Sequence, residues 1–365
     1  MKPVNRSFRS SLSLALLVLP APGTAAPCVA PTMACAEWVP LAGGSSRVLL
    51  HRTYSLEKRN AEITRALIVI HGVGRDADNY FRHALAAAFL AGALENTVVV
   101  APRFASHDGA ACRDTCAAGE VNWQCQGRER WAAGGAASDN LLITAFDALD
   151  EILRKLARRE AFPNLTAIVL AGHSAGGQFV SRYEMANRVH ELLSVPVSYV
   201  VANPSSYAYL DALRPSSSAL PASVSAAAPG YAPPPAGNLP PPFVPFPDAH
   251  NCTTYDNWPF GLQNRTGYAA NLTENELRTQ LAARPTTYLL GGLDILPLFG
   301  FDASCSAMSQ GPTRLARGLA FGRFVNEKYG ATHRTLVVPA CGHSARCMFT
   351  DEKSLPILFP GNQSP

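Results

Sequence analysis

The stretch Ala167-Ile168-Val169-Leu170-Ala171-Gly172-His173-Ser174-Ala175-Gly176-Gly177 is an apolar run that ends abruptly in a serine flanked by glycines. We interpret it as a strand, a tight turn and the start of a helix, with Ser174 at the tip of the turn. A serine hydroxyl is a poor nucleophile at neutral pH, so a catalytic serine must lie outside the sheet, near a base and near amide donors. Gly172 and Gly176 leave room where a Cβ would collide with neighbouring chain. The pattern therefore predicts a nucleophile at Ser174.

The N-terminus has the pattern of a secretory signal peptide. A basic start precedes an apolar stretch over about residues 12–19, and small residues follow at 23–26. The apolar stretch is shorter than the roughly 20 residues that a membrane-spanning helix needs. We therefore predict a signal peptide over residues 1–25, and a secreted or periplasmic protein without a stable membrane anchor.

Composition and charge limit the remaining possibilities. The chain has 365 residues, of which 47% are hydrophobic, so residues 26–365 are enough for one large α/β domain with insertions. The formal net charge is only +4, and part of it belongs to the leader. Because no basic patch or stripe stands out, we expect no nucleic-acid partner.

All nine cysteines follow the predicted cleavage point, which in an exported protein indicates disulfides. Close pairs such as Cys28 with Cys35 and Cys341 with Cys347 are candidate bridges, and an odd count leaves one thiol unpaired. Three cysteines lie together in the middle of the chain without the paired histidines that would complete a zinc pattern. They are Cys112, Cys116 and Cys125. We expect bridges rather than a metal site.

Apolar runs alternate with helical patterns along most of the chain, which predicts a mostly parallel sheet flanked by helices. The expected strands cover 37–40, 47–54, 66–70, 97–100, the run before Ser174, 197–201, 286–290 and 335–338, the first two being antiparallel. The expected helices cover about 78–93, 273–283 and 314–329, and a long helix capped by Ser138 or Asp139 with Leu142, Phe146, Leu149, Leu153 and Leu156 on its apolar face.

Two irregular insertions interrupt this rhythm. The first, over about 103–135, is rich in cysteine, which is typical of a binding loop or a disulfide-stapled insertion. The second, over about 213–270, is rich in proline, so neither a helix nor a central strand persists there. It is either a flexible surface loop or a lid that forms a wall of the substrate site. The aromatic residues available for such a wall are Phe243, Phe246, Tyr255 and Trp258.

Three polar residues follow directly on apolar strands, in the order Ser174, Asp294 and His343. Because the carboxyl ends of parallel strands share one edge of a sheet, residues far apart in sequence converge there. This order matches one known arrangement of a serine, an acid and a histidine. Asp302 is a rival for the acid, and His173 and His71 are rivals for the base, although His71 is better explained as a structural residue.

The chain resembles a secreted member of the α/β-hydrolase superfamily. The motifs that carry the resemblance are His71-Gly72-Val73, Gly172-His173-Ser174-Ala175-Gly176, Gly292-Leu293-Asp294 and Gly342-His343. The resemblance implies that Ser174 attacks a carbonyl carbon, that His343 transfers the proton, and that Asp294 orients the histidine. It also implies oxyanion donors at the backbone N–H groups of Val73 and Ala175, and a reaction that uses no metal or organic cofactor.

We therefore expect an exported serine hydrolase that cleaves a small-molecule or polymeric carboxylic ester through an acyl-enzyme intermediate. A lipase, a polyester depolymerase and a serine peptidase are the alternatives within this chemistry, because the G-x-S-x-G spacing does not separate them. A non-catalytic binding protein that kept the fold is the alternative of another class.

Overall fold

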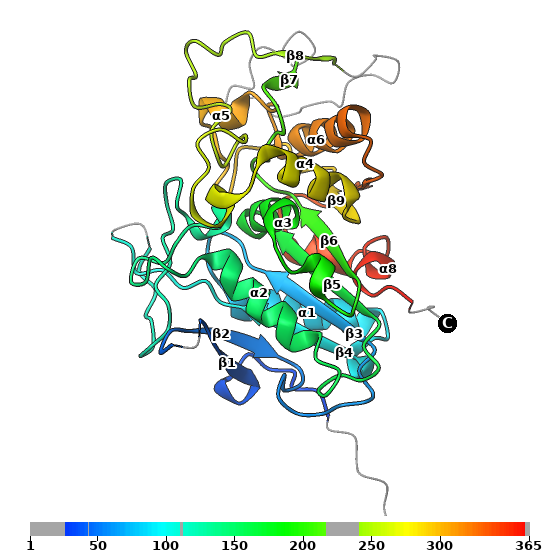
Figure 1. Cartoon of the computed structure of the whole chain (residues 1–365). Coiled ribbons are helices and arrows are strands. Elements are labelled where there is room, and N and C mark those ends of the chain that lie inside the picture. The colour runs from blue at the N-terminus through cyan, green and yellow to red at the C-terminus, as the bar shows by residue number, and fades with distance from the viewer. Residues whose placement is uncertain (1–25, 43, 110–111, 217–240, 362–365) are drawn as a thin grey trace, which may run out of the picture.

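The computed structural model describes residues 26–42, 44–109, 112–216 and 241–361 (Figure 1). The predicted signal peptide and residues 217–240 of the proline-rich insertion lie outside the described residues. Within the described part, none of the helices has the length and hydropathy that a bilayer crossing needs.

An eight-stranded sheet forms the centre of the described chain, in the order β1-β2-β4-β3-β5-β6-β9-β10. Pairings β1·β2 and β2·β4 are antiparallel and the remaining ones are parallel, as the apolar runs predict. The strands are β1 Ala36–Pro40, β2 Arg47–Arg52, β3 Arg65–Ile70, β4 Thr97–Pro102, β5 Ala167–His173, β6 Val197–Ala202, β9 Thr286–Gly291 and β10 Arg334–Val338. A small separate pair is formed by β7 Leu213–Pro215 and β8 Phe243–Pro245.

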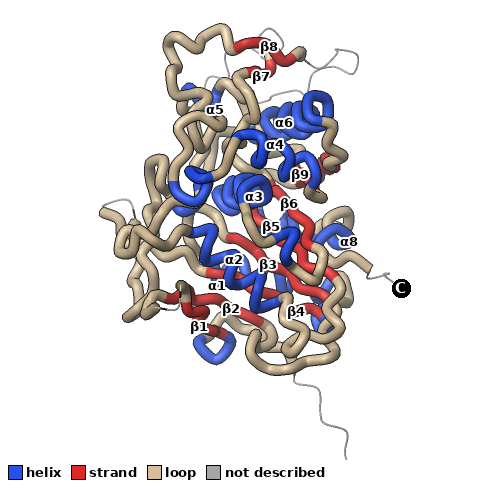
Figure 2. Tube along the Cα trace, in the orientation of Figure 1, coloured by secondary structure: helices blue, strands red, loops and turns tan. Residues whose placement is uncertain are grey.

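Helices cover both faces of the sheet (Figure 2). One face packs against α1 Ala77–Leu90, α7 Ala345–Thr350 and α8 Leu355–Leu358. The other face packs against α2 Ala145–Leu156, α3 Ala175–Ala186, α4 Glu274–Ala283 and α6 Arg314–Tyr329. The short α5 is Cys305–Met308, and 3-10 turns cover Met33–Cys35, Leu94–Asn96, Trp131–Ala133, His190–Leu192 and Gly267–Asn271.

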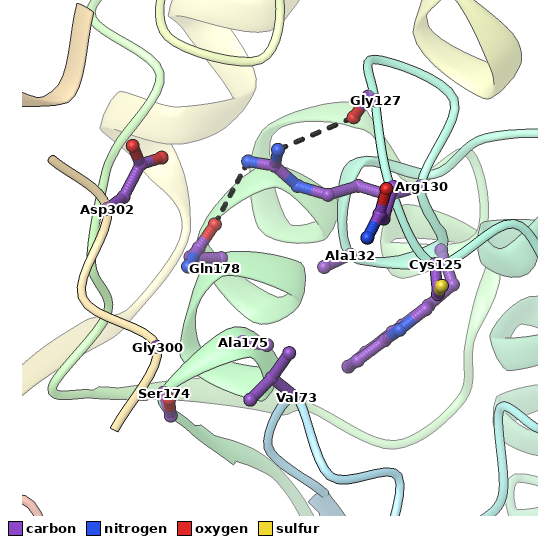
Figure 3. Close-up of a pocket in the computed structure, with 12 residues that line it drawn as sticks. Val73, Cys125, Gly127, Arg130, Ala132, Ser174, Ala175, Gln178, Gly300 and Asp302 are labelled. Atoms are coloured by element: carbon purple, nitrogen blue, oxygen red, sulfur yellow. Dashed lines mark hydrogen bonds between the residues drawn. The ribbon is translucent and has the colours of Figure 1, made fainter. Parts of the chain in front are cut away.

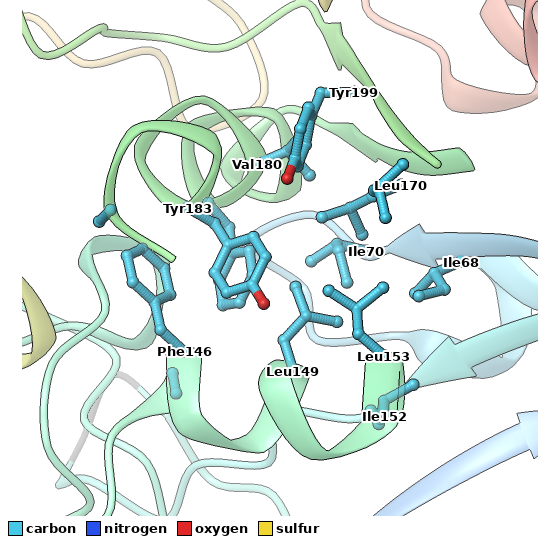
Figure 4. Packing of buried hydrophobic residues seen from close by; sticks show 14 of the residues in the cluster. Ile68, Ile70, Phe146, Leu149, Ile152, Leu153, Leu170, Val180, Tyr183 and Tyr199 are labelled. Atoms are coloured by element: carbon cyan, nitrogen blue, oxygen red, sulfur yellow. The ribbon is translucent and has the colours of Figure 1, made fainter. Parts of the chain in front are cut away.

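The strand residues alternate between these two layers, because successive side chains of a strand point to opposite faces. In β3, Ile68 and Ile70 belong to the core shared with α2 and α3, whereas Leu67 and Val69 belong to the core shared with α1. Figure 4 shows the first core, where side chains of α2 and α3 meet those of the sheet. The central strands are therefore buried on both sides, which holds the carboxyl ends of β5 and β9 in fixed positions.

The predicted start of the long helix after the first insertion is wrong. The helix α2 begins at Ala145, and its N-cap is Thr144, which forms a capping box with Asp147. Asp139 instead accepts the N–H of Asn122, and Leu142 is 92% exposed rather than part of an apolar face. The capping box predicted at Thr273 is present.

Four disulfides link the cysteines of the described chain. The two close pairs predicted from the sequence, Cys28–Cys35 and Cys341–Cys347, are present. The other two bridges are Cys112–Cys125 and Cys252–Cys305, and Cys116 stays a free thiol.

Both insertions contribute buried aromatic residues to the described structure. Trp123 and Trp131 of the first insertion are buried. In the second insertion, Trp258 is fully buried and donates its indole N–H to the carbonyl of Ala133, and the ring of Phe243 packs on Phe324. The four aromatic residues named for such a wall are not among the residues that line the pocket next to Ser174; they are Phe243, Phe246, Tyr255 and Trp258. The choice between a surface loop and a lid stays a prediction, because residues 217–240 lie outside the described residues.

Candidate active site

Ser174 lies in the tight turn between β5 and α3 with a φ of 60° and a ψ of −119°. Such a φ is rare for a residue with a side chain and marks a strained position. A Cβ built on Gly172 would lie 2.2 Å from the carbonyl oxygen of Gly176, and one built on Gly176 would lie 2.2 Å from that of Ile70. The glycines therefore permit the close packing of strand and helix that presents Ser174 at the edge of the sheet.

The structure brings Ser174, Asp294 and His343 together. His343 Nε2 lies 2.9 Å from Ser174 Oγ, and His343 Nδ1 lies 2.7 Å from Asp294 Oδ2. Because an ionised carboxylate only accepts hydrogen bonds, Nδ1 carries the proton in this arrangement and Nε2 accepts from the serine hydroxyl. The histidine is therefore in a tautomer that can accept a proton from the hydroxyl of Ser174. Asp302 does not take this place and lines the neighbouring pocket instead.

Asp294 is held from its other side by Arg314, at the first turn of α6. The carboxylate is 2% exposed, and its Oδ1 lies 3.3 Å from Arg314 Nη1. Arg314 also donates to Ser205 Oγ and to the carbonyl of Leu298. Burial lowers the pKa of Arg314, and the charge of Asp294 opposes this effect. The ion pair fixes the carboxylate so that Oδ2 faces the histidine.

The loop that carries His343 is anchored at two points. The Cys341–Cys347 bridge closes it, and Asn203 Nδ2 donates to the carbonyl of Gly342 at 3.2 Å. The Asn203 Oδ1 also accepts the N–H of Gly291, at the end of β9. Asn203 has a φ of 46°, which asparagine adopts more readily than most residues. This one side chain therefore ties the histidine loop to the strand that precedes Asp294.

The two rival histidines have other roles. His173 is buried, with Nδ1 3.0 Å from the hydroxyl of Tyr80, and burial lowers its pKa well below the ordinary value. His71 Nδ1 donates to the carbonyl of Gly72, and its Nε2 accepts the N–H of Phe104 at 2.9 Å. Burial lowers the pKa of His71 to about 4, so it is neutral at physiological pH. His71 thus joins the loop after β3 to the first insertion.

The proposed oxyanion donors lie beside the serine. Val73 and Ala175 both line the pocket next to Ser174, and within the described residues their N–H groups have no hydrogen-bond acceptor. Arg75, with a φ of 55°, donates to the carbonyl of Val73 and pairs with Asp114 at 2.6 Å. This contact holds the loop after β3 in a conformation that leaves the Val73 N–H free.

A pocket of about 410 Å³ opens next to Ser174 (Figure 3). Trp131, Ala132 and Arg130 of the first insertion form one wall, and Gln178 of α3 lies at its base. Sequence reasoning missed Arg130 and Gln178, because nothing in the motifs connects a residue of the insertion with the helix after the elbow. Among the described residues no cluster of three or more potential metal ligands occurs.

Comparisons with known proteins identify the family and the fold. The model of the alpha/beta hydrolase family matches residues 67–353. The structure of LpqC, a poly(3-hydroxybutyrate) depolymerase from Bordetella parapertussis, is similar with a TM-score of 0.54 at 21% identity, covering 87% of this chain and 89% of that one. Poly(aspartic acid) hydrolase-1 from Sphingomonas sp. KT-1 is similar with a TM-score of 0.57 at 19% identity, covering 89% and 98%. No curated protein was found to match the sequence.

Proposed function

The chain belongs to the alpha/beta hydrolase family, and we propose that within it this protein is an exported serine hydrolase that cleaves carboxylic esters. The observation that carries the proposal is the position of His343, whose two ring nitrogens face Ser174 Oγ at 2.9 Å and Asp294 Oδ2 at 2.7 Å. An activated serine needs a base within hydrogen-bond reach and a third group that orients that base. These contacts support both requirements, in a line formed by the buried Ser174 and Asp294 and the half-buried His343.

The reaction follows from these contacts. As Ser174 Oγ bonds to the carbonyl carbon, its proton passes to His343 Nε2, and Asp294 stabilises the resulting imidazolium. The N–H groups of Val73 and Ala175 stabilise the oxyanion, each by about 3 kcal/mol. His343 then delivers the proton to the leaving alcohol as the carbon–oxygen bond breaks. Water repeats the sequence on the acyl-enzyme and frees Ser174.

Export is supported by the cysteine chemistry and the N-terminal pattern. The described residues contain four disulfides, which form and persist in oxidising compartments such as the periplasm and the extracellular space. The basic start and short apolar stretch of residues 1–25 are typical of a signal peptide.

A second candidate is the hydrolysis of hydrophobic lipids or polyesters. The segment after Asp294 exposes apolar side chains next to the reacting residues, and the ring of Phe299 stacks at 6.3 Å from that of His343. The exposed fractions are 57% for Leu293, 44% for Leu296, 49% for Leu298 and 71% for Phe299. Exposed apolar patches of this kind favour contact with an apolar surface.

Labelling with a fluorophosphonate probe tests the proposed nucleophile. Wild type should label and Ser174→Ala should not, while Ser194→Ala, a control at an exposed serine, should label like wild type. An unlabelled wild type, or equal labelling of Ser174→Ala, would refute the serine mechanism. A series of p-nitrophenyl esters of increasing acyl length, run beside a polyester film and a peptide, then separates the candidates. A steep preference for short soluble esters would exclude the second candidate.

A further inference from the structure

One wall of the pocket beside Ser174 carries the guanidinium group of Arg130, which has no carboxylate partner among the described residues. Arg130 Nη2 donates to Gln178 Oε1 at 3.2 Å, and Nη1 donates to the carbonyl of Gly127 at 3.4 Å. Figure 3 shows the guanidinium reaching over the pocket toward Gln178. Both partners are neutral, so they hold the guanidinium in place without balancing its charge.

A second arginine lies directly behind the same acceptor. Arg182 is fully buried and donates to Gln178 Oε1 at 3.3 Å and to Ser206 Oγ at 3.0 Å. Its other acceptors are backbone carbonyls, and within the described residues neither Arg130 nor Arg182 forms an ion pair. Burying a cation without an anion is costly. An anion that binds at Arg130 lowers this cost for both arginines.

The acidic residue of the pocket does not neutralise them. Asp302 lies across the pocket from Arg130 in Figure 3, and its Oδ1 accepts the N–H of Ser304 at 3.0 Å. Burial lowers the pKa of both arginines, and the charge of Asp302 opposes this effect from beyond ion-pair distance. Two cations therefore face one anion, and the local charge is positive.

The position of the pocket decides which part of an ester enters it. Val73 and Ala175, the proposed oxyanion donors, line the pocket together with Ser174, whereas His343 is not among the lining residues. The leaving alcohol must lie next to His343, because that residue gives it a proton. The acyl part of the ester therefore extends into the pocket, toward Arg130.

We propose that Arg130 binds a carboxylate on the acyl group, so that the preferred substrates are monoesters of dicarboxylic acids. This inference rests on the proposed function. In the reaction the bond from Ser174 Oγ to the ester carbon forms and the bond to the alcohol breaks. Water then releases the dicarboxylate, and the distal carboxylate stays unchanged throughout. A guanidinium is suited to this task because its N–H fork matches a carboxylate.

The test compares charged and neutral esters of equal chain length. The monoethyl esters of succinic, glutaric and adipic acid are run against ethyl butanoate, pentanoate and hexanoate, with acid release followed in a pH-stat. The measured quantity is the ratio of kcat/KM for the charged over the neutral ester. In Arg130→Gln this ratio should fall by about 10- to 100-fold at the favoured length, as expected for a lost charge-assisted hydrogen bond. Arg128→Gln, at an exposed arginine outside the pocket lining, should keep the wild-type ratio.

Further arms keep the outcomes distinct. In wild type the ratio should fall with rising salt, and free adipate should compete with the ester; this measurement stands even where Arg130→Gln does not fold. Asp302→Asn should raise the ratio of kcat/KM for the charged over the neutral ester. A fall in this ratio would overturn the inference, and would favour an acyl group that carries a positive and a negative charge. Equal losses on both ester types in Arg130→Gln would mean a structural role and overturn it as well.

The failure of the proposed function looks different. If wild type hydrolyses the neutral esters through Ser174 but shows no preference for the charged ones, only the present inference fails. If neither ester type is hydrolysed, the proposed function fails and the inference fails with it.

Discussion

Replacing Asp294 with asparagine tests the line of side chains at its most buried point. The exchange keeps the shape of the side chain but removes the charge next to His343 Nδ1, 2.7 Å away. An amide that turns its NH₂ toward Nδ1 would also force the proton onto Nε2, where it blocks transfer from Ser174. Neither effect changes the contacts that bind the ester, so we expect the loss in kcat rather than in KM.

The size of the effect follows from the contacts. With an effective dielectric constant of about 20, opposite charges about 3 Å apart attract by about 5.5 kcal/mol. The guanidinium of Arg314, 3.3 Å from the other carboxylate oxygen, repels the imidazolium in wild type and variant alike, so it does not change the difference between them. The dipole of the asparagine amide keeps a part of the lost attraction. We therefore expect a net loss of about 4 to 5 kcal/mol, which lowers kcat by about 1,000- to 5,000-fold.

The assay is the steady-state hydrolysis of p-nitrophenyl acetate, with thermal unfolding followed by circular dichroism as a check on folding. Arg314 keeps acceptors at Ser205 Oγ and at the carbonyl of Leu298, so the variant should remain folded. Asp302→Asn, which removes the rival acid, should cost less than about ten-fold, because Asp302 makes no contact with His343 in the described structure. A loss below ten-fold in Asp294→Asn, or an equal loss in both variants, would refute the assigned role.

Three further expectations concern stability, measured by urea unfolding. Burial raises the pKa of Asp150 from 3.8 to about 6, so the stability that its protonated form contributes is present below pH 3.8 and lost as the pH rises through 6. Asp150→Asn should remove this dependence, so the stability of the variant relative to wild type should rise by about 3 kcal/mol between pH 3 and pH 7. A difference that stays constant with pH would contradict this expectation. Gly176→Ala places a Cβ 2.2 Å from a backbone oxygen and should lower the free energy of unfolding by about 3 kcal/mol or more. In the control Gly44→Ala the nearest atom is 4.0 Å from the new Cβ, so the free energy of unfolding should change little. Similar losses in both variants would disprove the packing argument. Replacing Cys252 and Cys305 by serine removes a bridge with a sequence separation of 53 and should lower the free energy of unfolding by about 4 kcal/mol. The same exchange at Cys341 and Cys347, with a separation of 6, should lower it by about 2 kcal/mol, and only this exchange should also lower kcat. A larger stability loss for the second pair would contradict the loop-entropy account.

The sheet was predictable because its central strands are buried on both faces. A strand of this kind is a continuous apolar run, so β6 was expected at 197–201 and is found at Val197–Ala202. The start of α2 was missed although its signal is present, since Thr144 and Asp147 have the spacing of a capping box. Leu142 misled the prediction because an apolar residue one turn before a helix fits the helical period by chance.

The candidate site also contains residues that the sequence could predict and residues that it could not. Ser174, Asp294 and His343 were predictable because each follows a strand whose carboxyl end lies at the same sheet edge. Arg130 and Gln178 were not, because their contact joins residues 48 positions apart through the folding of an irregular segment. The Cys252–Cys305 bridge was hidden for the same reason, because its partners lie 53 positions apart in the sequence. The spacing of neighbouring residues indicates turns and helix caps, but it does not indicate which distant residues a long loop contacts in the folded protein.

The burial of the first insertion has a consequence for anyone who wishes to change what this enzyme accepts. Trp131 stacks on Phe104 and lies against Phe179 of α3, so the segment that shapes the pocket also covers the helix that follows Ser174. Exchanging the whole segment for that of another enzyme would strip this helix of its cover and unfold the protein. Redesign of selectivity must therefore proceed by single replacements on the pocket side, such as Arg130 and Gln126, while the tryptophans stay in place.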